Sequence, residues 1–199
     1  MSTAPILEPV MEPQQDPIDL LIAIEEASQA PIRPEYIEGA VSVPPQPNDQ
    51  HNDGAFELSY QFRVAGIRLV GMNNGYRAAH KDGSTMALVI PDFYVRRRRP
   101  SDLDESYRRA HKGWYPIDMV ALVGEVTSSN HETDTGPKLR TYAAADVPVY
   151  VLIDRHAKKA TCHSVPVDGH YTTRTEVDLG RPLPLPEPYP TLDTAPFVD

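Results

Sequence analysis

The chain has 199 residues, and its 19 Lys and Arg against 28 Asp and Glu give a formal net charge of −9. Hydrophobic residues make up 40% of the chain, which is enough for a packed core and excludes a wholly disordered polypeptide. The single cysteine, Cys162, excludes an intramolecular disulfide and a zinc cage of cysteines. No apolar run reaches the roughly 20 residues of a membrane span, and the first residues lack the pattern of a signal peptide. We therefore expect a soluble cytoplasmic protein with no membrane partner.

Charge and proline are unevenly distributed. The first 38 residues hold eight acids and one base, a net −7, which leaves −2 for the rest. Of the 21 prolines, nine lie within residues 1–47 and six within 182–196. These changes in charge and proline content divide the chain into three predicted parts. They are a disordered, acidic and Pro-rich leader (1–15), a single domain (16–180) and an extended Pro-rich tail (181–199).

In the first half of the domain, Asp16-Pro17 is typical of a helix N-cap followed by a first-turn proline, and it predicts a helix over 18–27. Residues 36–43 are expected to form a strand with a bend at Gly39, and apolar spacing predicts a second helix over 48–65. Three strands are predicted at 67–72, 75–80 and 87–95, with a hairpin turn at 71–75. The polar stretch 96–116 shows little periodicity and is expected to form a long loop.

The second half is more regular. Residues 117–126 are almost continuously apolar, as in a central strand covered on both faces. A helix is predicted over 133–145, with Asp134 as N-cap and Pro137 in its first turn, and a buried strand over 147–153. Strands 159–165 and 171–177 follow, joined by a turn at Asp168-Gly169. The order of the elements predicts an α/β fold with a mixed sheet.

Two carboxylates fall where desolvation is costly. Asp92 follows Pro91 inside an apolar segment, and Glu125 lies at the C-terminal end of the buried strand. Together at one sheet edge they would make an oxygen-rich site for Mg²⁺ or Mn²⁺. Lys138 lies near the start of the following helix, which returns across the strand end, so we expect its ammonium beside them. This set suits metal-assisted hydrolysis of a phosphodiester.

Each of these residues also has an ordinary structural interpretation. Pro-Asp is a common turn element, a strand-end glutamate often pairs with arginine, and a lysine on a helix is usually solvated. Their order and topology together favour the functional interpretation.

Four segments resemble the Uma-two family of restriction-endonuclease-type proteins, which belongs to the PD-(D/E)xK nuclease superfamily. They are Pro91-Asp92, Val123–Ser129, Asp134–Tyr142 and Val147–Asp154. The similarity runs from about Glu35 to about Tyr171. It implies a restriction-endonuclease-like core, a mixed β-sheet flanked by helices, here extended by the N-terminal helix and the Pro-rich tail.

The same resemblance implies site residues. Asp92 and Glu125 would hold the metal, with a main-chain carbonyl at Val126 as a further ligand. The usual lysine position of the superfamily is Thr127 here, whereas Lys138 matches the helix-borne lysine of the Uma-two pattern. Glu38 and Glu57 are candidate accessory acids, and Thr135 stands where many relatives have arginine.

A basic cluster follows the segment that carries Asp92. It comprises Arg96, Arg97, Arg98, Arg99, Arg108 and Arg109. One interpretation is a phosphate-binding patch next to the metal site. The other is a solvated loop balanced by nearby acids.

Two functions remain open at this point. The first is a Mg²⁺-dependent endonuclease that acts on DNA. The second is a nuclease-fold protein that binds nucleic acid or regulates without cleaving it. A homodimer is expected, because cutting both strands of a duplex favours two active sites. The sequence does not show which residues would form its interface.

Overall fold

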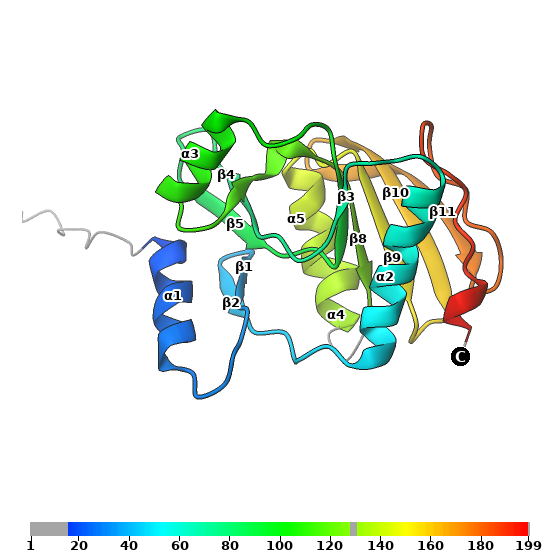
Figure 1. Ribbon diagram of the computed structural model, residues 1–199, viewed down its shortest axis with the longest axis horizontal. Helices are drawn as coiled ribbons and strands as arrows, with labels where there is room; N and C mark the ends of the chain where they lie inside the picture. The colour runs from blue at the N-terminus through cyan, green and yellow to red at the C-terminus, as the bar shows by residue number, and fades with distance from the viewer. Residues whose placement is uncertain (1–15, 128–130, 199) are drawn as a thin grey trace, which may run out of the picture.

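The structure is a computed structural model that describes residues 16–127 and 131–198. Its strands form two sheets with helices packed around them (Figure 1). The helical elements are α1 (Pro17–Ala27), α2 (Asp49–Val64), α3 (Asp102–Ala110), η1 (Ile117–Met119), α4 (His131–Thr133), η2 (Asp134–Lys138), α5 (Leu139–Ala144) and η3 (Ala195–Phe197). The predicted leader, residues 1–15, lies outside the described residues.

The larger sheet has six strands in the order β11-β10-β9-β8-β6-β3. These strands are β3 (Val70–Gly71), β6 (Phe93–Arg96), β8 (Val120–Val126), β9 (Val149–Asp154), β10 (Lys159–Val167) and β11 (His170–Asp178). Neighbours are antiparallel except β8 and β9, which run parallel. A parallel pair needs a crossover connection, and the helical segment α4-η2-α5 supplies it.

The smaller sheet has five strands in the order β2-β1-β5-β4-β7. These strands are β1 (Glu35–Ile37), β2 (Ala40–Ser42), β4 (Tyr76–Ala79), β5 (Thr85–Val89) and β7 (Tyr115–Pro116). Helix α1 packs on it through Ile18 and Leu21, which are buried with Leu88 of β5. The two sheets and their helices give the α/β fold with mixed sheets that the sequence predicts.

Alternation of buried side chains along the larger sheet divides the core in two. One face carries Leu122 and Val151, which are buried with Leu58 and Phe62 of α2. The other face carries Val123 and Tyr150, which are buried with Tyr142 of α5 and with the small sheet. Glu125 lies two residues after Val123, so it shares this second face, where α5 covers it.

The C-terminal segment packs against the first of these faces. Leu183, Leu192 and Phe197 are buried in the same core as α2, and Leu183 pairs with Leu192 through a β-bridge. In Figure 1 this segment lies beside β11, at the opposite end of the molecule from α1. The division of the domain at residue 180 stays a prediction.

Several predicted elements are confirmed with small changes of boundary. The Asp16 carboxylate accepts a hydrogen bond from the Ile18 amide at 2.9 Å, so the N-cap of α1 is as expected. Helix α2, the central strand β8, strand β9 and the hairpin of β10 and β11 are also present. Asp168 and Gly169 form the predicted turn, both with positive φ.

The predicted strand at 36–43 is wrong in one respect. It forms two antiparallel strands, β1 and β2, that pair with each other. Glu38 and Gly39 between them have φ of 50° and 82°, the left-handed values that a two-residue hairpin turn requires. The bend expected at Gly39 is therefore a complete reversal of the chain.

The predicted strand at 87–95 is also divided. Its first half is β5 of the small sheet and its second half is β6 of the large sheet. The connection Ile90-Pro91-Asp92 passes from one sheet to the other. Pro91 has no amide hydrogen to donate, so it suits a break between two strands better than the middle of one. Asp92 therefore lies between strands. The turn predicted at 71–75 is not a hairpin either, since β3 pairs with β6 while β4 pairs with β5.

Two predictions about helices need correction. The stretch 96–116 contains α3, whose N-terminus has a capping box in which the Ser101 amide donates to Asp104 at 2.7 Å. The buried side chain of α3 is Asp104, whereas Leu103 is 81% exposed, so the helix has no apolar stripe that its sequence could reveal. Asp134 is not an N-cap, since it lies inside the helical segment at the start of the π-helical turn η2 and its side chain is buried.

Candidate active site

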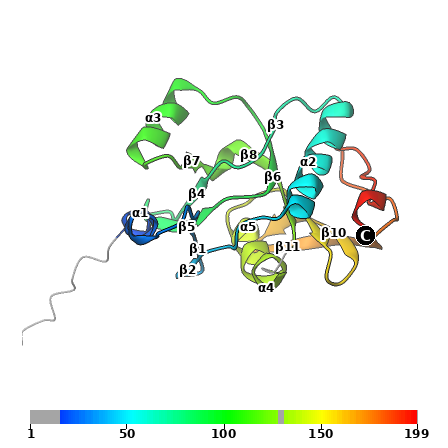
Figure 2. The ribbon, with the colours of Figure 1, turned by 60° about the horizontal axis from the view of Figure 1, so that its bottom comes forward.

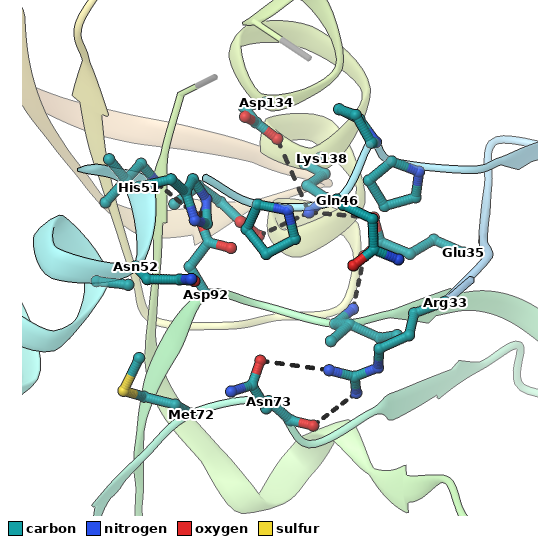
Figure 3. A pocket seen from close by; sticks show the side chains of 17 residues that line it. Arg33, Glu35, Gln46, His51, Asn52, Met72, Asn73, Asp92, Asp134 and Lys138 are labelled. Carbon is teal, nitrogen blue, oxygen red and sulfur yellow. Dashed lines mark hydrogen bonds and ion pairs between the residues drawn. The ribbon is translucent and has the colours of Figure 1, made fainter. Parts of the chain in front are cut away.

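A cavity of about 140 Å³ opens where the two sheets meet the helical crossover. Its walls come from β1, the start of α2, the connection between β5 and β6, the end of β8 and the turn η2 (Figure 3). The Pro-rich strap 44–47 covers one side, held by a hydrogen bond from the Gln46 amide to the Pro31 carbonyl. Asp92, Glu125 and Lys138 all line this cavity, so the structure brings together the three predicted catalytic residues.

Asp92 is held by two donors. Its Oδ2 accepts a hydrogen bond from the Val126 amide at 2.8 Å and lies 3.0 Å from Nε2 of His51, in the first turn of α2. Burial raises the pKa of Asp92, but the His51 hydrogen bond and the charge of Lys138 outweigh burial and leave this pKa below its usual value. Asp92 is therefore an anion of fixed orientation, and its Oδ1 takes part in neither contact.

Glu125 is 1% exposed and uses one oxygen for two contacts. Its Oε1 lies 3.1 Å from Nζ of Lys138 and accepts a hydrogen bond from the Tyr142 hydroxyl at 2.8 Å. Burial raises the pKa of Glu125 well above its usual value, and Lys138 offsets this only in part. The second oxygen, Oε2, takes part in neither contact.

Lys138 lies among several carboxylates. Besides Glu125, its Nζ is 3.2 Å from Oε2 of Glu35 and 3.8 Å from Oδ1 of Asp134 (Figure 3). Burial lowers the pKa of Lys138, but Glu125, Glu35 and Asp134 outweigh it and hold this pKa well above its usual value. The ammonium group therefore stays charged inside the protein.

Glu35 also belongs to this cluster, which the sequence patterns did not predict. Its Oε1 accepts a hydrogen bond from the Ile90 amide at 2.6 Å, while Oε2 faces Lys138. Glu35 is buried on the same face of β1 as Ile37. This alternation was the signal that could have identified it, because an acid at an inward position of a strand needs a partner.

Four acidic side chains of the site share one lysine. The charge of Lys138 is shared by the acids Glu125, Glu35, Asp134 and Asp92. Burial raises the pKa of Asp134 to about 7. Burial thus opposes the charged forms of Glu125 and Asp134, and a divalent cation would favour those forms by adding positive charge beside Lys138. Hard carboxylate oxygens are the ligands that Mg²⁺ and Mn²⁺ prefer.

The donor set fits Mg²⁺ better than a metal that needs a closed cage. In the described part of the chain, no group of three His, Cys, Asp or Glu side chains has the geometry of a ready-made metal cluster. Mg²⁺ keeps several water ligands and is often bound through one or two carboxylates. Asp92 and Glu125, each with one oxygen outside the contacts above, meet that requirement.

Comparison with known proteins now identifies the family. The model of the Uma2 (Uma-two) family, described as "Putative restriction endonuclease", matches residues 19–196. The chain belongs to the Uma2 family. No curated protein matches it.

A solved structure shares the fold of this Uma2 protein. It is the crystal structure of a "putative nuclease belonging to DUF820" from Anabaena variabilis, at 15% sequence identity and a TM-score of 0.57. The match covers 89% of this chain and 96% of that one. The similarity confirms the predicted restriction-endonuclease-like core, and the family description supports a nuclease. In the described part of the Uma2 chain, no helix has the length and apolarity needed to cross a membrane.

The two predicted accessory acids lie away from the centre of the site. Glu38 pairs with Arg140 at 2.6 Å on the surface, and this hydrogen bond lowers the pKa of Glu38. Glu57 accepts a hydrogen bond from Gln61 within α2 at 3.0 Å and does not line the cavity. In this Uma2 protein the acid of the first strand that reaches Lys138 is Glu35, three residues before Glu38.

Val126 and Thr127 continue β8 past Glu125. The contact observed at Val126 is its amide donating to Asp92, so the carbonyl ligand stays a prediction. Thr127, at the usual lysine position of the superfamily, is buried, and its hydroxyl accepts a hydrogen bond from the Arg155 amide at 2.9 Å. The lysine beside Glu125 in this Uma2 protein comes from the crossover helix instead.

The arginine cluster is not next to this site. Phe93, adjacent to Asp92, pairs with Gly124, whereas Arg96 pairs with Val120 at the other end of β8. At about 3.3 Å per residue, Arg96 lies on the order of 13 Å from Asp92 along the strand. In Figures 1 and 2, α3 and the α4 turn likewise lie on opposite sides of the molecule. The expectation that the cluster adjoins the metal site is therefore wrong.

Most of these arginines contact protein groups. Arg97 donates to the Val120 carbonyl at 3.1 Å, and Arg98 forms a two-pronged ion pair with Asp104. Arg108 stacks over the ring of Tyr115 at 5.4 Å, and Arg109 donates to the Ser106 hydroxyl at 2.9 Å. Contact between this cluster and DNA stays a prediction.

Proposed function

We propose that this Uma2 protein is a metal-dependent endonuclease that hydrolyses phosphodiester bonds of DNA. The observation that carries the proposal is the convergence of Asp92, Glu125 and Lys138 in one cavity, with the Lys138 ammonium 3.1 Å from Glu125. The family description supports the reaction class. The alternative of a nuclease-fold protein that binds without cleaving differs in needing neither the cation nor the lysine.

In this proposal Asp92 and Glu125 hold Mg²⁺ or Mn²⁺. A bound divalent ion supplies Lewis-acid polarisation of a phosphate and a lowered pKa of bound water. His51 and the Val126 amide orient Asp92, and the Tyr142 hydroxyl orients Glu125. Fixing these carboxylates before substrate arrives lowers the reorganisation that the reaction requires.

Lys138 contributes a positive charge within the carboxylate cluster. Its high pKa keeps it protonated at neutral pH, so it acts by stabilising the negative charge that develops on the phosphate oxygens, not by removing a proton. Glu35 and Asp134 restrict its position. Glu35 is a positioning residue because it acts through Lys138.

The test is cleavage of supercoiled plasmid and of labelled single- and double-stranded oligonucleotides, with Mg²⁺ or Mn²⁺ and with EDTA. Asp92→Asn, Glu125→Gln and Lys138→Met are each expected to lower the rate by about a hundredfold or more. Glu57→Gln, at a half-buried position of α2 outside the cavity, is the matched control and is expected to keep full activity. Calorimetric titration with Mn²⁺ separates the functions. If the protein binds Mn²⁺ and Asp92→Asn abolishes that binding, the result supports the nuclease. If it binds DNA but no metal, the result supports the protein that binds without cleaving.

A further inference from the structure

The outer face of α2 carries apolar side chains that the described part of the chain leaves uncovered. Phe56, Tyr60 and Val64 are 63%, 53% and 68% exposed, and their spacing of four places them on one stripe of the helix. The rings of Phe56 and Tyr60 stack with centroids 6.4 Å apart. The opposite face of α2 is already buried on the large sheet through Leu58 and Phe62. A helix with apolar side chains on both faces is typical of one that packs against a second partner.

Charges along the same stripe are arranged by sign. Asp49 and Asp53 are exposed toward the N-terminal end of α2, and at 100° per residue they project from the side that carries Phe56 and Tyr60. Arg63 is exposed near the C-terminal end, where its Nη2 donates to the Val70 carbonyl at 2.7 Å and leaves Nη1 for a second partner, and Arg68 is exposed just beyond it. On the stripe itself acids therefore occupy one end and bases the other, while Glu57 and Asp193 lie beside it at the hollow described below.

We propose that α2 is a homodimer interface in which two copies of this chain pack antiparallel along this stripe. In that register Phe56 of one copy meets Tyr60 of the other, and Asp53 meets Arg63, each contact occurring twice about the two-fold axis. A parallel pairing would bring acids against acids and bases against bases. Self-complementarity of this kind is what an isologous interface requires.

A hollow beside the stripe adds a matching shape. It has a volume of about 310 Å³ and lies between the C-terminal half of α2, at Tyr60, Val64 and Ala65, and the tail at Thr191. A Phe56 ring of the second copy would fill part of it. Nucleic acid fits the stripe less well, because Asp49 and Asp53 repel phosphates although the aromatic rings suit base stacking. A single helix pair gives a small interface, so the dimer should form at micromolar concentrations.

The first test is sedimentation velocity of the full-length protein from about 1 to 100 μM. Wild type is expected to shift from monomer to dimer over this range. Tyr60→Glu and Phe56→Glu should each weaken the dimer more than about tenfold. Leu103→Glu is the control, since Leu103 is also exposed but lies on α3. A monomer at every concentration, or a dimer that neither stripe variant weakens, would overturn the proposal.

A second test fixes the orientation of the helices. Asp53→Arg and Arg63→Asp should each weaken the dimer, and the double charge exchange should restore it. The double variant Asp53→Cys/Arg63→Cys should also form covalent dimers on mild oxidation, whereas each single cysteine variant should not. The native Cys162 is buried, so it does not compete. Efficient cross-linking of the single variant Asp53→Cys would mean parallel helices and would contradict the register.

Discussion

Glu35 and Lys138, which lie 103 residues apart in the sequence, meet with Oε2 and Nζ 3.2 Å apart inside the candidate site. The hairpin strand β1 supplies the glutamate, and the helical crossover supplies the lysine. This ion pair links the small sheet to the α4-η2-α5 segment at the point where Glu125 also contacts the lysine.

Glu35→Gln tests the positioning role of this pair. The amide keeps the size of the side chain but removes the charge opposite Lys138, so the ammonium should become less restricted. We expect kcat to fall by about 10–100-fold with little change in KM for DNA. Steady-state cleavage kinetics measure both constants. The control is Glu38→Gln, whose surface pairing with Arg140 should make no difference to either constant. Equal effects from the two variants would remove the assigned role.

His51 is expected to orient Asp92. In His51→Ala, Asp92 loses one of the two donors at its Oδ2, and the affinity for Mn²⁺ should fall by about tenfold or more. His51→Gln should restore part of this affinity, because its amide donates a hydrogen bond at a similar reach. Calorimetry with Mn²⁺ gives the affinities directly. If Gln behaved like Ala, the imidazole would act in some way other than as a hydrogen-bond donor to Asp92.

Gly124 is required by close packing next to both carboxylates. A Cβ added there would lie 1.8 Å from the ring of Phe93, the residue that follows Asp92. Gly124→Ala should therefore lower the free energy of unfolding by about 1–3 kcal/mol and also lower activity, since a shift of the Phe93 backbone that relieves the clash would also move Asp92.

Gly136→Ala is the matched control for that substitution. Its added Cβ would meet only the Arg140 side chain, at 3.5 Å, within the same crossover segment. Urea unfolding should give nearly wild-type stability for this variant. A tolerated Gly124→Ala would show that the strand pair adapts more than the packing indicates.

Asp134 predicts a pH dependence of stability. Burial raises its pKa to about 7, and the neighbouring carboxylates add to this against the opposing effect of Lys138. The folded state therefore binds this proton more tightly than the unfolded chain, so ionisation of Asp134 destabilises the fold as pH rises from about 4 to about 7. In EDTA, Asp134→Asn should gain stability relative to wild type by on the order of 2 kcal/mol across that window. Urea unfolding at intervals of pH measures the difference, and a constant offset at every pH would contradict it.

Local sequence patterns were enough for much of this fold. The Asp16-Pro17 cap and the turn at Asp168-Gly169 depend on interactions between near neighbours, and the apolar run of β8 reflects burial on both faces. Each occurs where the sequence predicts it. Asp92 and Glu125 could be selected as candidates because a charged group in an apolar segment needs a partner wherever the segment ends up. The same reasoning missed Glu35, whose strand is only three residues long.

Relations between distant segments required the tertiary structure. The sequence by itself determined the class of fold, the family resemblance and three of the residues in the cavity, because these follow from composition, periodicity and motif. Only the packed chain decided that β5 and β6 separate into two sheets at Pro91, that Arg96 lies away from the site, and that Glu35 and His51 line the same cavity. Strand register and sheet partners are set by long-range hydrogen bonds and side-chain packing, which no local pattern encodes.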